Sequence, residues 1–285
     1  VTTQPSASPS VCAGTSVTFT AAASGLPTPT VKWQKNISSV WTDISGATSN
    51  TYTISTPVVA DAGQYRALYT NSEGSTGSNT STLTVTAIPT GGSVNSSATV
   101  CSGSNSGTLT LSGNTGTVQK WQSSTNGGSN WNDISNTSSS QNYTNLSTTT
   151  MYRAVVQSSG CTANSASATI TVNPTTSITT QPTNSSVCQN SNASFNVAAN
   201  GVGLSYQWQD NSTGSFADIS GATSATLNLT SVGVAMSGRQ YKCIVSGTCG
   251  SATSNTVTLT VSTPSIGGSV STSTSVCAGS NSGVL

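Results

Sequence analysis

The chain has 285 residues and a net charge of +1, and only 5% of its residues are charged, against about a quarter in an ordinary soluble domain. It has no basic or acidic run, which argues against recognition of nucleic acid or of an anionic membrane through charge. It also lacks a stretch of about 18 apolar residues, so we expect no membrane insertion. The absence of His removes Ser/His and Cys/His catalytic arrangements and His-based metal sites.

The polar residues are mainly Ser, Thr, Asn and Gly. Thr suits the pleated surface of a strand, whereas Ser, Asn and Gly suit turns. Five Trp, seven Tyr and regularly spaced Val, Leu and Ile argue against a disordered polar stalk. The composition therefore predicts an all-β protein.

A short cysteine motif recurs four times along the chain, as SVCAGTS, TVCSGSN, SVCQNSN and SVCAGSN. Its cysteines are Cys12, Cys101, Cys188 and Cys277, so that successive motifs lie 89, 87 and 89 residues apart. This period is the size of one small β-sandwich. We therefore expect domains at residues 1–86, 87–173 and 174–262, followed by the start of a fourth domain at 263–285.

Alternate units are more alike than neighbours. The first and third open with VTTQP and ITTQP, whereas the second and fourth share GGSV at Gly91 and Gly267. This pattern predicts a two-domain cassette copied in tandem. Because the last residues, Ser282-Gly-Val-Leu285, repeat Ser106-Gly-Thr-Leu109 from within an expected core strand, we expect the chain to be a piece of a longer repeat protein.

Period-2 alternation of apolar and polar residues predicts about seven short strands in each unit. In the first unit the strands fall, in chain order, around Val17–Phe19, Val31–Trp33, Trp41–Ile44, Tyr52–Ile54, Tyr65–Tyr69 and Leu83–Val85.

Three features of these strands are typical of immunoglobulin-like sandwiches. A Trp on the third strand is expected to plug each core, at Trp33, Trp121 and Trp208. The segment Asp61-Ala-Gly-Gln-Tyr65 is similar to a tyrosine corner, with Tyr152 and Tyr241 at the sister positions. A Thr-rich strand closes each unit, around Leu83, Ile170 and Leu259.

With these motifs the chain resembles the immunoglobulin-like repeats of giant bacterial surface adhesins and of gliding or grappling filaments exported by type 9 secretion. The resemblance covers essentially the whole chain. It implies an all-β fold of tandem immunoglobulin-like β-sandwich domains, an extracellular or cell-surface location, and a structural or adhesive function. An oxidising compartment also fits the seven Cys.

Within this scheme Cys101 is expected to pair with Cys161, and Cys188 with Cys249, each bond stapling one unit. The first unit has Glu73 and Gly74 where a partner for Cys12 is expected. Cys12 is then either a buried free thiol or a link to another chain. Cys243 and Cys277 are further candidates for a free or interchain thiol. Cys243 is expected as a small buried residue on an inner strand position, and the partner of Cys277 is expected beyond the given sequence.

No catalytic, cofactor or metal site is predicted, and we expect the chain not to be an enzyme. The acidic residues Asp43, Asp133 and Asp218 recur in one W/F-x-D-I-S element and suit a structural role. The aromatic residues of the same element, Trp41, Trp131 and Phe216, either stack on a sugar ring or cover the edge of the sandwich.

We therefore expect a repeat module of an extracellular filament or stalk that associates with other copies of the same chain and attaches to a cell surface, with cell-surface glycans as a further partner. The weakly charged surface favours such association. The alternative is a carbohydrate-binding or spacer region appended to a secreted hydrolase.

Overall fold

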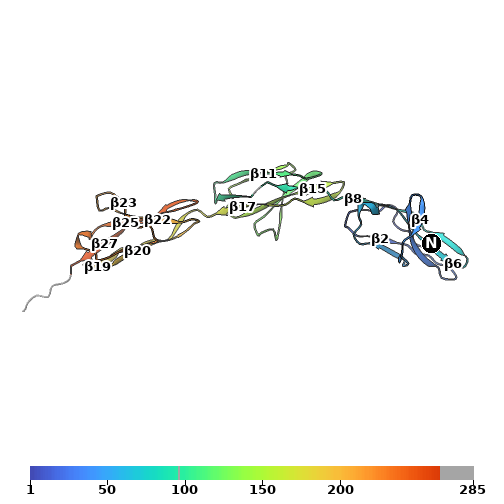
Figure 1. Ribbon diagram of the computed structural model, residues 1–285, viewed down its shortest axis with the longest axis horizontal. Helices are drawn as coiled ribbons and strands as arrows, with labels where there is room; N and C mark the ends of the chain where they lie inside the picture. Colours follow the sequence, from blue (N-terminus) through green and yellow to red (C-terminus); the bar gives the residue numbers. More distant parts are fainter. Residues whose placement is uncertain (96, 264–285) are drawn as a thin grey trace, which may run out of the picture. The chain divides into compact units, whose positions relative to one another are not determined.

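The computed structural model describes residues 1–95 and 97–263. The chain divides into two compact units, one formed by Val1–Val100 with Ser104–Thr171 and the other by Cys101–Gly103 with the chain from Val172 onward. Within the described residues, buried apolar side chains form three separate core clusters. Each cluster belongs to one β-sandwich, drawn mainly in blue, green or orange in Figure 1. The clusters lie within 1–86, 87–173 and 174–262, although the domain boundaries themselves stay a prediction.

The first sandwich contains eight strands, of which β1 and β7 were not expected from the sequence. They are β1 Ser10–Cys12, β2 Val17–Thr20, β3 Thr30–Ile37, β4 Val40–Asp43, β5 Thr51–Ile54, β6 Gly63–Asn71, β7 Gly74–Gly77 and β8 Ser81–Thr86. One sheet has the order β1-β8-β6-β3-β4 with β7 beside β6, and the facing sheet is the pair β2-β5. A 3-10 turn, Val59–Asp61, precedes β6.

The second sandwich repeats this plan. Its strands are β9 Ser93–Val94, β10 Ala98–Cys101, β11 Ser106–Ser112, β12 Thr117–Ser124, β13 Asn132–Ile134, β14 Ser140–Thr144, β15 Thr150–Ser158, β16 Cys161–Asn164 and β17 Ala168–Asn173. The larger sheet has the order β10-β17-β15-β12-β13 with β16 beside β15, and the facing sheet has the order β14-β11-β9.

The third sandwich follows the same order again. Its strands are β18 Ser177–Thr180, β19 Ser185–Cys188, β20 Ala193–Asn196, β21 Ala198–Asn200, β22 Ser205–Asp210, β23 Ala217–Asp218, β24 Thr226–Leu229, β25 Gln240–Gly247, β26 Gly250–Thr253 and β27 Val257–Ser262. The larger sheet is β19-β27-β25-β22-β23 with β26 beside β25, and β20-β24 and β18-β21 form separate pairs. The expected all-β fold of tandem sandwiches is confirmed.

Strand alternation sorts the side chains into core and surface. Along β2, Val17 and Phe19 are buried whereas Thr18 and Thr20 are exposed. The same period places Leu83 and Val85 of β8 in the core and Thr82 and Thr84 outside. The outer face of these strands carries Thr hydroxyls because successive side chains of a strand point to opposite faces of the sheet.

The expected Trp plug is present in every sandwich. The side chains of Trp33, Trp121 and Trp208 are fully buried. Each indole N–H donates to a backbone carbonyl 16 or 17 residues further along the chain, on Ser49, Ser138 and Ser224, at 2.9 to 3.0 Å. A buried indole N–H normally needs such an acceptor, so each bond fixes the loop before β5, β14 or β24 against the core.

The tyrosine corner is confirmed in the first sandwich. The Tyr65 hydroxyl donates to the backbone carbonyl of Asp61 at 2.7 Å. In the third sandwich the buried hydroxyl of Tyr241 makes no hydrogen bond with the described residues. Ser237 stands where the first sandwich has Asp61, and its hydroxyl accepts from the backbone N–H of Val261.

In each sandwich the strand that ends in the recurring cysteine of the sequence motif, which we call the entry cysteine, lies beside the last strand. In the first, β1 pairs with β8 so that Cys12 stands opposite Thr86, and in the third β19 pairs with β27 so that Cys188 stands opposite Ser262. In the second, β10 likewise adjoins β17. The entry cysteine therefore lies where the chain leaves the sandwich.

The core clusters predict local destabilisation by a Trp substitution. Trp33→Ala removes a fully buried indole and should lower the free energy of unfolding of the first sandwich by about 3 to 5 kcal/mol. Hydrogen exchange followed by mass spectrometry should show faster exchange in β3 and β6 and unchanged exchange in β25. The matched control is Trp41→Ala, whose half-exposed ring should cost roughly 1 kcal/mol or less. Equal acceleration in β25 would contradict independent cores.

Candidate functional site

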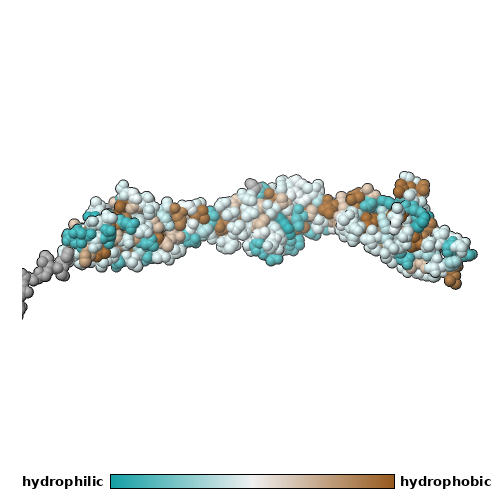
Figure 2. Space-filling model, turned by 60° about the horizontal axis from the view of Figure 1, so that its bottom comes forward, coloured by the Kyte–Doolittle hydropathy of each residue, from teal (hydrophilic) through white to brown (hydrophobic). Residues whose placement is uncertain are grey.

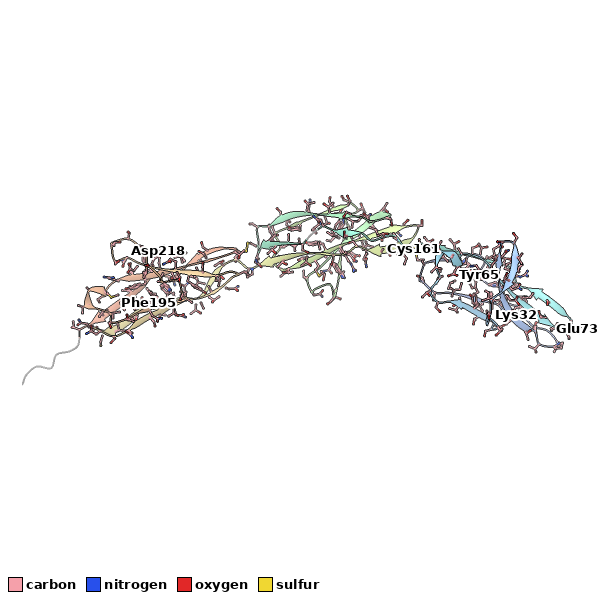
Figure 3. The ribbon with its side chains drawn as sticks, in the orientation of Figure 1. Lys32, Tyr65, Glu73, Cys161, Phe195 and Asp218 are labelled. Carbon is pink, nitrogen blue, oxygen red and sulfur yellow. A yellow bond between two sulfur atoms is a disulfide. The ribbon has the colours of Figure 1, made fainter. Side chains whose placement is uncertain are left out.

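The first notable site is a disulfide that joins two sandwiches. Cys12, at the end of β1, is bonded to Cys161, the first residue of β16, with a Cα–Cα distance of 5.8 Å and a sequence separation of 149. Figure 3 labels Cys161 at one end of the second sandwich. The Cys161 sulfur also lies 3.9 Å from the carbonyl oxygen of Thr86, the residue opposite Cys12.

A second disulfide repeats this arrangement between the second and third sandwiches. Cys101, at the end of β10, is bonded to Cys249, just before β26, with a Cα–Cα distance of 5.5 Å and a sequence separation of 148. The carbonyl of Cys249 accepts a hydrogen bond from the backbone N–H of Thr176 at 3.1 Å. We call Cys12–Cys161 and Cys101–Cys249 the repeat-linking disulfides.

The expected pairings within a unit, Cys101 with Cys161 and Cys188 with Cys249, are wrong. The first sandwich shows why: β6 pairs with β8 near Gly63, on the side of Cys12, but pairs with β7 at Asn71, on the side of the hairpin. Eight residues of strand span about 26 Å, whereas the Cα atoms of a disulfide lie within about 7 Å. We call Cys161 and Cys249, which lie at the β15–β16 and β25–β26 hairpins, the hairpin cysteines. The entry cysteine and the hairpin cysteine of one sandwich thus lie at opposite ends of its larger sheet.

The other thiols differ from one another. Cys12 is neither a free thiol nor an interchain link in this structure, which corrects that expectation. Cys188 is free and exposed, and Cys243 is free and buried, as expected for Cys243. Burial raises the pKa of the Cys243 thiol, which keeps it protonated and unreactive. Cys277 lies outside the described residues.

A second repeated feature crosses three neighbouring strands on one face of the first sandwich. Asp43 on β4 accepts hydrogen bonds from Lys32 at 2.9 Å and Gln34 at 2.7 Å, both on β3. The Gln34 carbonyl oxygen accepts from Nε of Arg66 on β6 at 2.9 Å. The Arg66 guanidinium lies 4.3 Å from the centre of the Trp41 ring. We call these residues and their counterparts the cation–aromatic strip.

The strip recurs nearly unchanged in the second sandwich. Asp133 accepts from Lys120 and from Gln122, both at 2.7 Å, and Gln122 accepts from Arg153 at 2.8 Å. The Arg153 guanidinium lies 4.1 Å from the Trp131 ring centre. Identical contacts at matching strand positions indicate a structural function in the sheet.

The third sandwich keeps part of the strip. Gln209 donates to Asp218 at 2.7 Å, and Lys242 lies 4.3 Å from the ring centre of Phe216. Gln207 replaces the lysine and donates instead to the carbonyl of Ile219. Figure 3 labels Asp218 and Lys32 at their strips.

Two carboxylates of the strip titrate below their usual range. Hydrogen bonds from Gln34 and then Lys32 hold the pKa of Asp43 below its ordinary value of 3.8, and bonds from Gln122 and Lys120 do the same for Asp133. A lowered folded-state pKa stabilises the fold above the unfolded pKa, and this contribution is lost as pH falls through the lowered value. The strip is therefore intact at neutral pH.

For the expected sugar-stacking residues, the structure shows what one face of each ring meets. A cation covers a face of Trp41, Trp131 and Phe216, which supports the edge-covering interpretation, while stacking on a sugar stays a prediction. Sequence reasoning missed the partners Arg66, Arg153 and Lys242. The signal was available, because all three lie one residue after the corner tyrosines Tyr65, Tyr152 and Tyr241.

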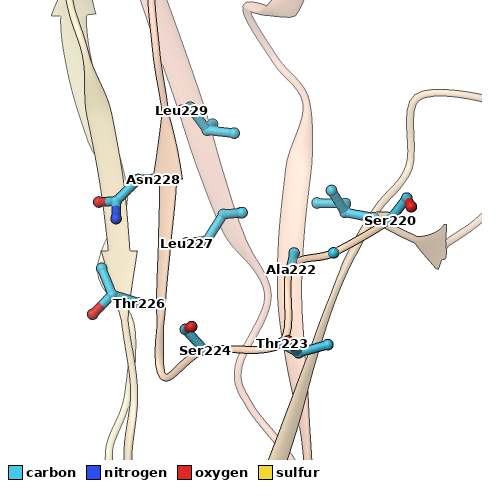
Figure 4. A pocket seen from close by; sticks show the side chains of 10 residues that line it. Ser220, Ala222, Thr223, Ser224, Thr226, Leu227, Asn228 and Leu229 are labelled. Carbon is cyan, nitrogen blue, oxygen red and sulfur yellow. The ribbon is translucent and has the colours of Figure 1, made fainter.

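The described residues contain no group of three or more His, Cys, Asp and Glu that could hold a metal ion. One pocket of the third sandwich lies around the turn from β23 to β24 (Figure 4). It is lined by small, hydroxyl-bearing, amide and aliphatic side chains, and the matching turn of the first sandwich forms a similar hollow. These two linings offer hydroxyl groups but no His, Lys or carboxylate that could activate one as a nucleophile. In the part of the chain that the structure describes, no helix has the length and apolarity needed to cross a membrane.

Two family models match the chain. One, described as "Domain of unknown function (DUF8696)", matches residues 90–174 and again 177–263. The other, described as "Immunoglobulin domain", matches residues 1–71. Together the matches cover parts of all three sandwiches, and the second agrees with the immunoglobulin-like fold.

Among curated proteins, Endoglucanase C of Cellulomonas fimi is 45% identical over 85 residues, which is 30% of this chain and 8% of that protein. The chain thus spans a small fraction of the relative that it matches.

Among solved structures, the chain is similar to the I-band fragment I67-I69 from titin, with 17% identity and a TM-score of 0.42. The match covers 92% of this chain and 97% of the titin fragment. The three N-terminal domains of the outer capsid protein Hoc of bacteriophage RB49 cover 88% and 95%, with 16% identity and the same TM-score. Likeness at this level carries no information about function.

The repeat-linking disulfides predict a definite thiol pattern. In Cys12→Ser, alkylation of the denatured but unreduced chain should label Cys161, which the wild-type chain should leave unlabelled, while Cys101 and Cys249 stay linked. Peptide mapping by mass spectrometry measures this. The matched control, Cys243→Ser, should leave both bonds in place. Recovery of a peptide linking Cys101 to Cys161 in the wild-type chain would contradict the structure.

Proposed function

The chain belongs to the family described as "Domain of unknown function (DUF8696)", and since that description assigns no activity, we propose that the chain is a non-enzymatic structural and adhesive module. In this proposal its immunoglobulin-like sandwiches form part of an extracellular filament or stalk of a giant bacterial surface protein, of the kind exported by type 9 secretion. The observation that carries the proposal is the pair of repeat-linking disulfides.

The disulfides support an extracellular, load-bearing function. Structural disulfides persist in oxidising compartments and are rare in the cytosol of most organisms. A bond that joins successive repeats also changes how tension travels. A pull on Val1 reaches Cys12, where the disulfide divides the tension between the first sandwich and Cys161 of the second.

The second disulfide joins Cys101 to Cys249 and creates a second junction. Three chain segments connect the two junctions in parallel, namely 12–101, 101–161 and 161–249. The shortest of them, 101–161, limits the separation of the junctions to about 200 Å, at about 3.3 to 3.6 Å per residue. Tension between the junctions is therefore shared by all three sandwiches.

The charge distribution supports association between copies. Most of the few charged side chains are engaged within the cation–aromatic strips, and the visible face in Figure 2 is mainly pale, with small hydrophobic and hydrophilic spots. A surface with little net charge lacks the repulsion that keeps copies apart. Lateral packing of several copies is therefore part of the proposal.

Single-molecule pulling on the chain, tethered through its two ends, tests the load-bearing function. Under reducing conditions the three sandwiches should unfold in three steps, each on the order of 250 Å. In the oxidised protein the extension between the two disulfides should not exceed about 200 Å, because the three sandwiches are extended in parallel. The matched control is oxidised Cys12→Ser, in which only the Cys101–Cys249 bond remains. There the first sandwich should unfold in a step on the order of 250 Å, while the second and third stay within the closed loop. Three long steps in the oxidised wild-type chain would refute the shared load.

The similarity to Endoglucanase C favours one alternative, a carbohydrate-binding or spacer region of a secreted hydrolase. In this alternative the rings of the strip, such as Trp41 and Trp131, stack on sugar units.

Two measurements on the same preparation separate the two functions. The leading proposal expects a sedimentation coefficient that rises with concentration and no retention on insoluble cellulose. The alternative expects a monomer at every concentration and retention that the double variant Trp41→Ala, Trp131→Ala abolishes. A monomer without retention would leave the pulling result as the sole support for a structural function.

A further inference from the structure

We propose that Cys188 is the attachment site for another repeat, and that its partner is the hairpin cysteine of a following sandwich of the same type as the second one. This inference rests on the proposed function of the repeat-linking disulfides, because it extends their pattern by one step.

The environment of Cys188 matches those of the two cysteines that are already linked. Cys12 stands opposite Thr86, whose carbonyl accepts from the next N–H, that of Ala13, at 2.8 Å. Cys188 stands opposite Ser262, whose carbonyl accepts from the next N–H, that of Gln189, at 2.9 Å. After Cys101, the N–H of Ser102 donates to the carbonyl of Asn173 in the same way at 2.8 Å.

The loop after Cys188 is also held as in the first sandwich. Two residues after Cys12, the N–H of Gly14 donates to the carbonyl of Pro57 at 2.8 Å. Two residues after Cys188, the N–H of Asn190 donates to the carbonyl of Val232 at 2.9 Å. Cys188 is nevertheless exposed, whereas its bonded counterparts Cys12 and Cys101 are partly covered. It therefore has their backbone setting without the neighbour that covers them.

The sequence identifies that neighbour. After the third sandwich the chain repeats the opening of the second, with Gly267-Gly-Ser-Val270 matching Gly91-Gly-Ser-Val94 and Cys277 matching Cys101. From Leu259 to Gly267 the chain has the same length as from Leu83 to Gly91. In a repeat of this type the linking cysteine is Cys161, which follows the turn at Ser159 and Gly160, both with positive φ.

The bond forms by thiol–disulfide exchange with a low-molecular-weight disulfide. The Cys188 thiolate attacks one sulfur of that disulfide, forms a mixed disulfide and releases one thiol. The hairpin thiolate then attacks the Cys188 sulfur and releases the second thiol. Two protein thiols lose two electrons and two protons, and the small disulfide is reduced to two thiols.

The test extends the full chain by one repeat. A copy of residues 110–173 is joined after Leu285, because Leu285 matches Leu109 and the copy continues the repeat from there. The extended protein is then oxidised with glutathione disulfide. Cys188, which a thiol reagent labels in the unextended chain, should lose its labelling, and a peptide linking it to the copied Cys161 should appear. Cys243 serves as an internal reference that should stay unlinked.

The matched control carries Cys161→Ser in the copied repeat only, and in it Cys188 should be labelled again. A second extension places residues 88–173, unaltered, directly after Thr263, which matches Ala87, so that the added repeat is one that the structure already contains. Full labelling of Cys188 in both extended chains would overturn the inference. Because labelling measures neither tension nor adhesion, that result would leave the pulling test of the proposed function unaffected.

Discussion

In each sandwich the strand that carries the entry cysteine pairs with the last strand, and this pairing sets the position of that cysteine. The parallel register of β1 with β8 puts Cys12 beside the point where the chain leaves the first sandwich. The β15–β16 hairpin, by contrast, puts Cys161 at the opposite end of its own sheet. With tandem repeats of this polarity, the entry cysteine of one sandwich can meet only the hairpin cysteine of the next.

This polarity makes the set of disulfides directional. The first sandwich contributes Cys12 but has Glu73 at its hairpin tip, labelled in Figure 3, and so it receives no link. The second contributes Cys101 and receives a link at Cys161, and the third receives one at Cys249. The two closed loops overlap in sequence, which is why the shortest covalent route through the chain is much shorter than the chain itself.

The cation–aromatic strips show how a weakly charged protein uses its charges. In the first two sandwiches an Asp, a Gln and an Arg face each other across three strands, and the Arg covers an aromatic ring. The third keeps the Gln and Asp but uses Lys242 as its cation and lacks the lysine that binds the Asp in the other two. These contacts stabilise the sheet locally and leave a surface composed mainly of hydroxyl and amide groups.

The sequence by itself determined the repeat, the all-β class, the Trp plugs and the strand faces, because each follows from a local period or a single residue type. It could not determine which cysteines are bonded. Cys101 and Cys161 belong to the same repeat, yet sequence spacing does not reveal at which end of a sheet a residue lies. Only the tertiary structure decided that, since strand direction and register place two residues of one repeat at opposite ends and bring together two cysteines 149 positions apart.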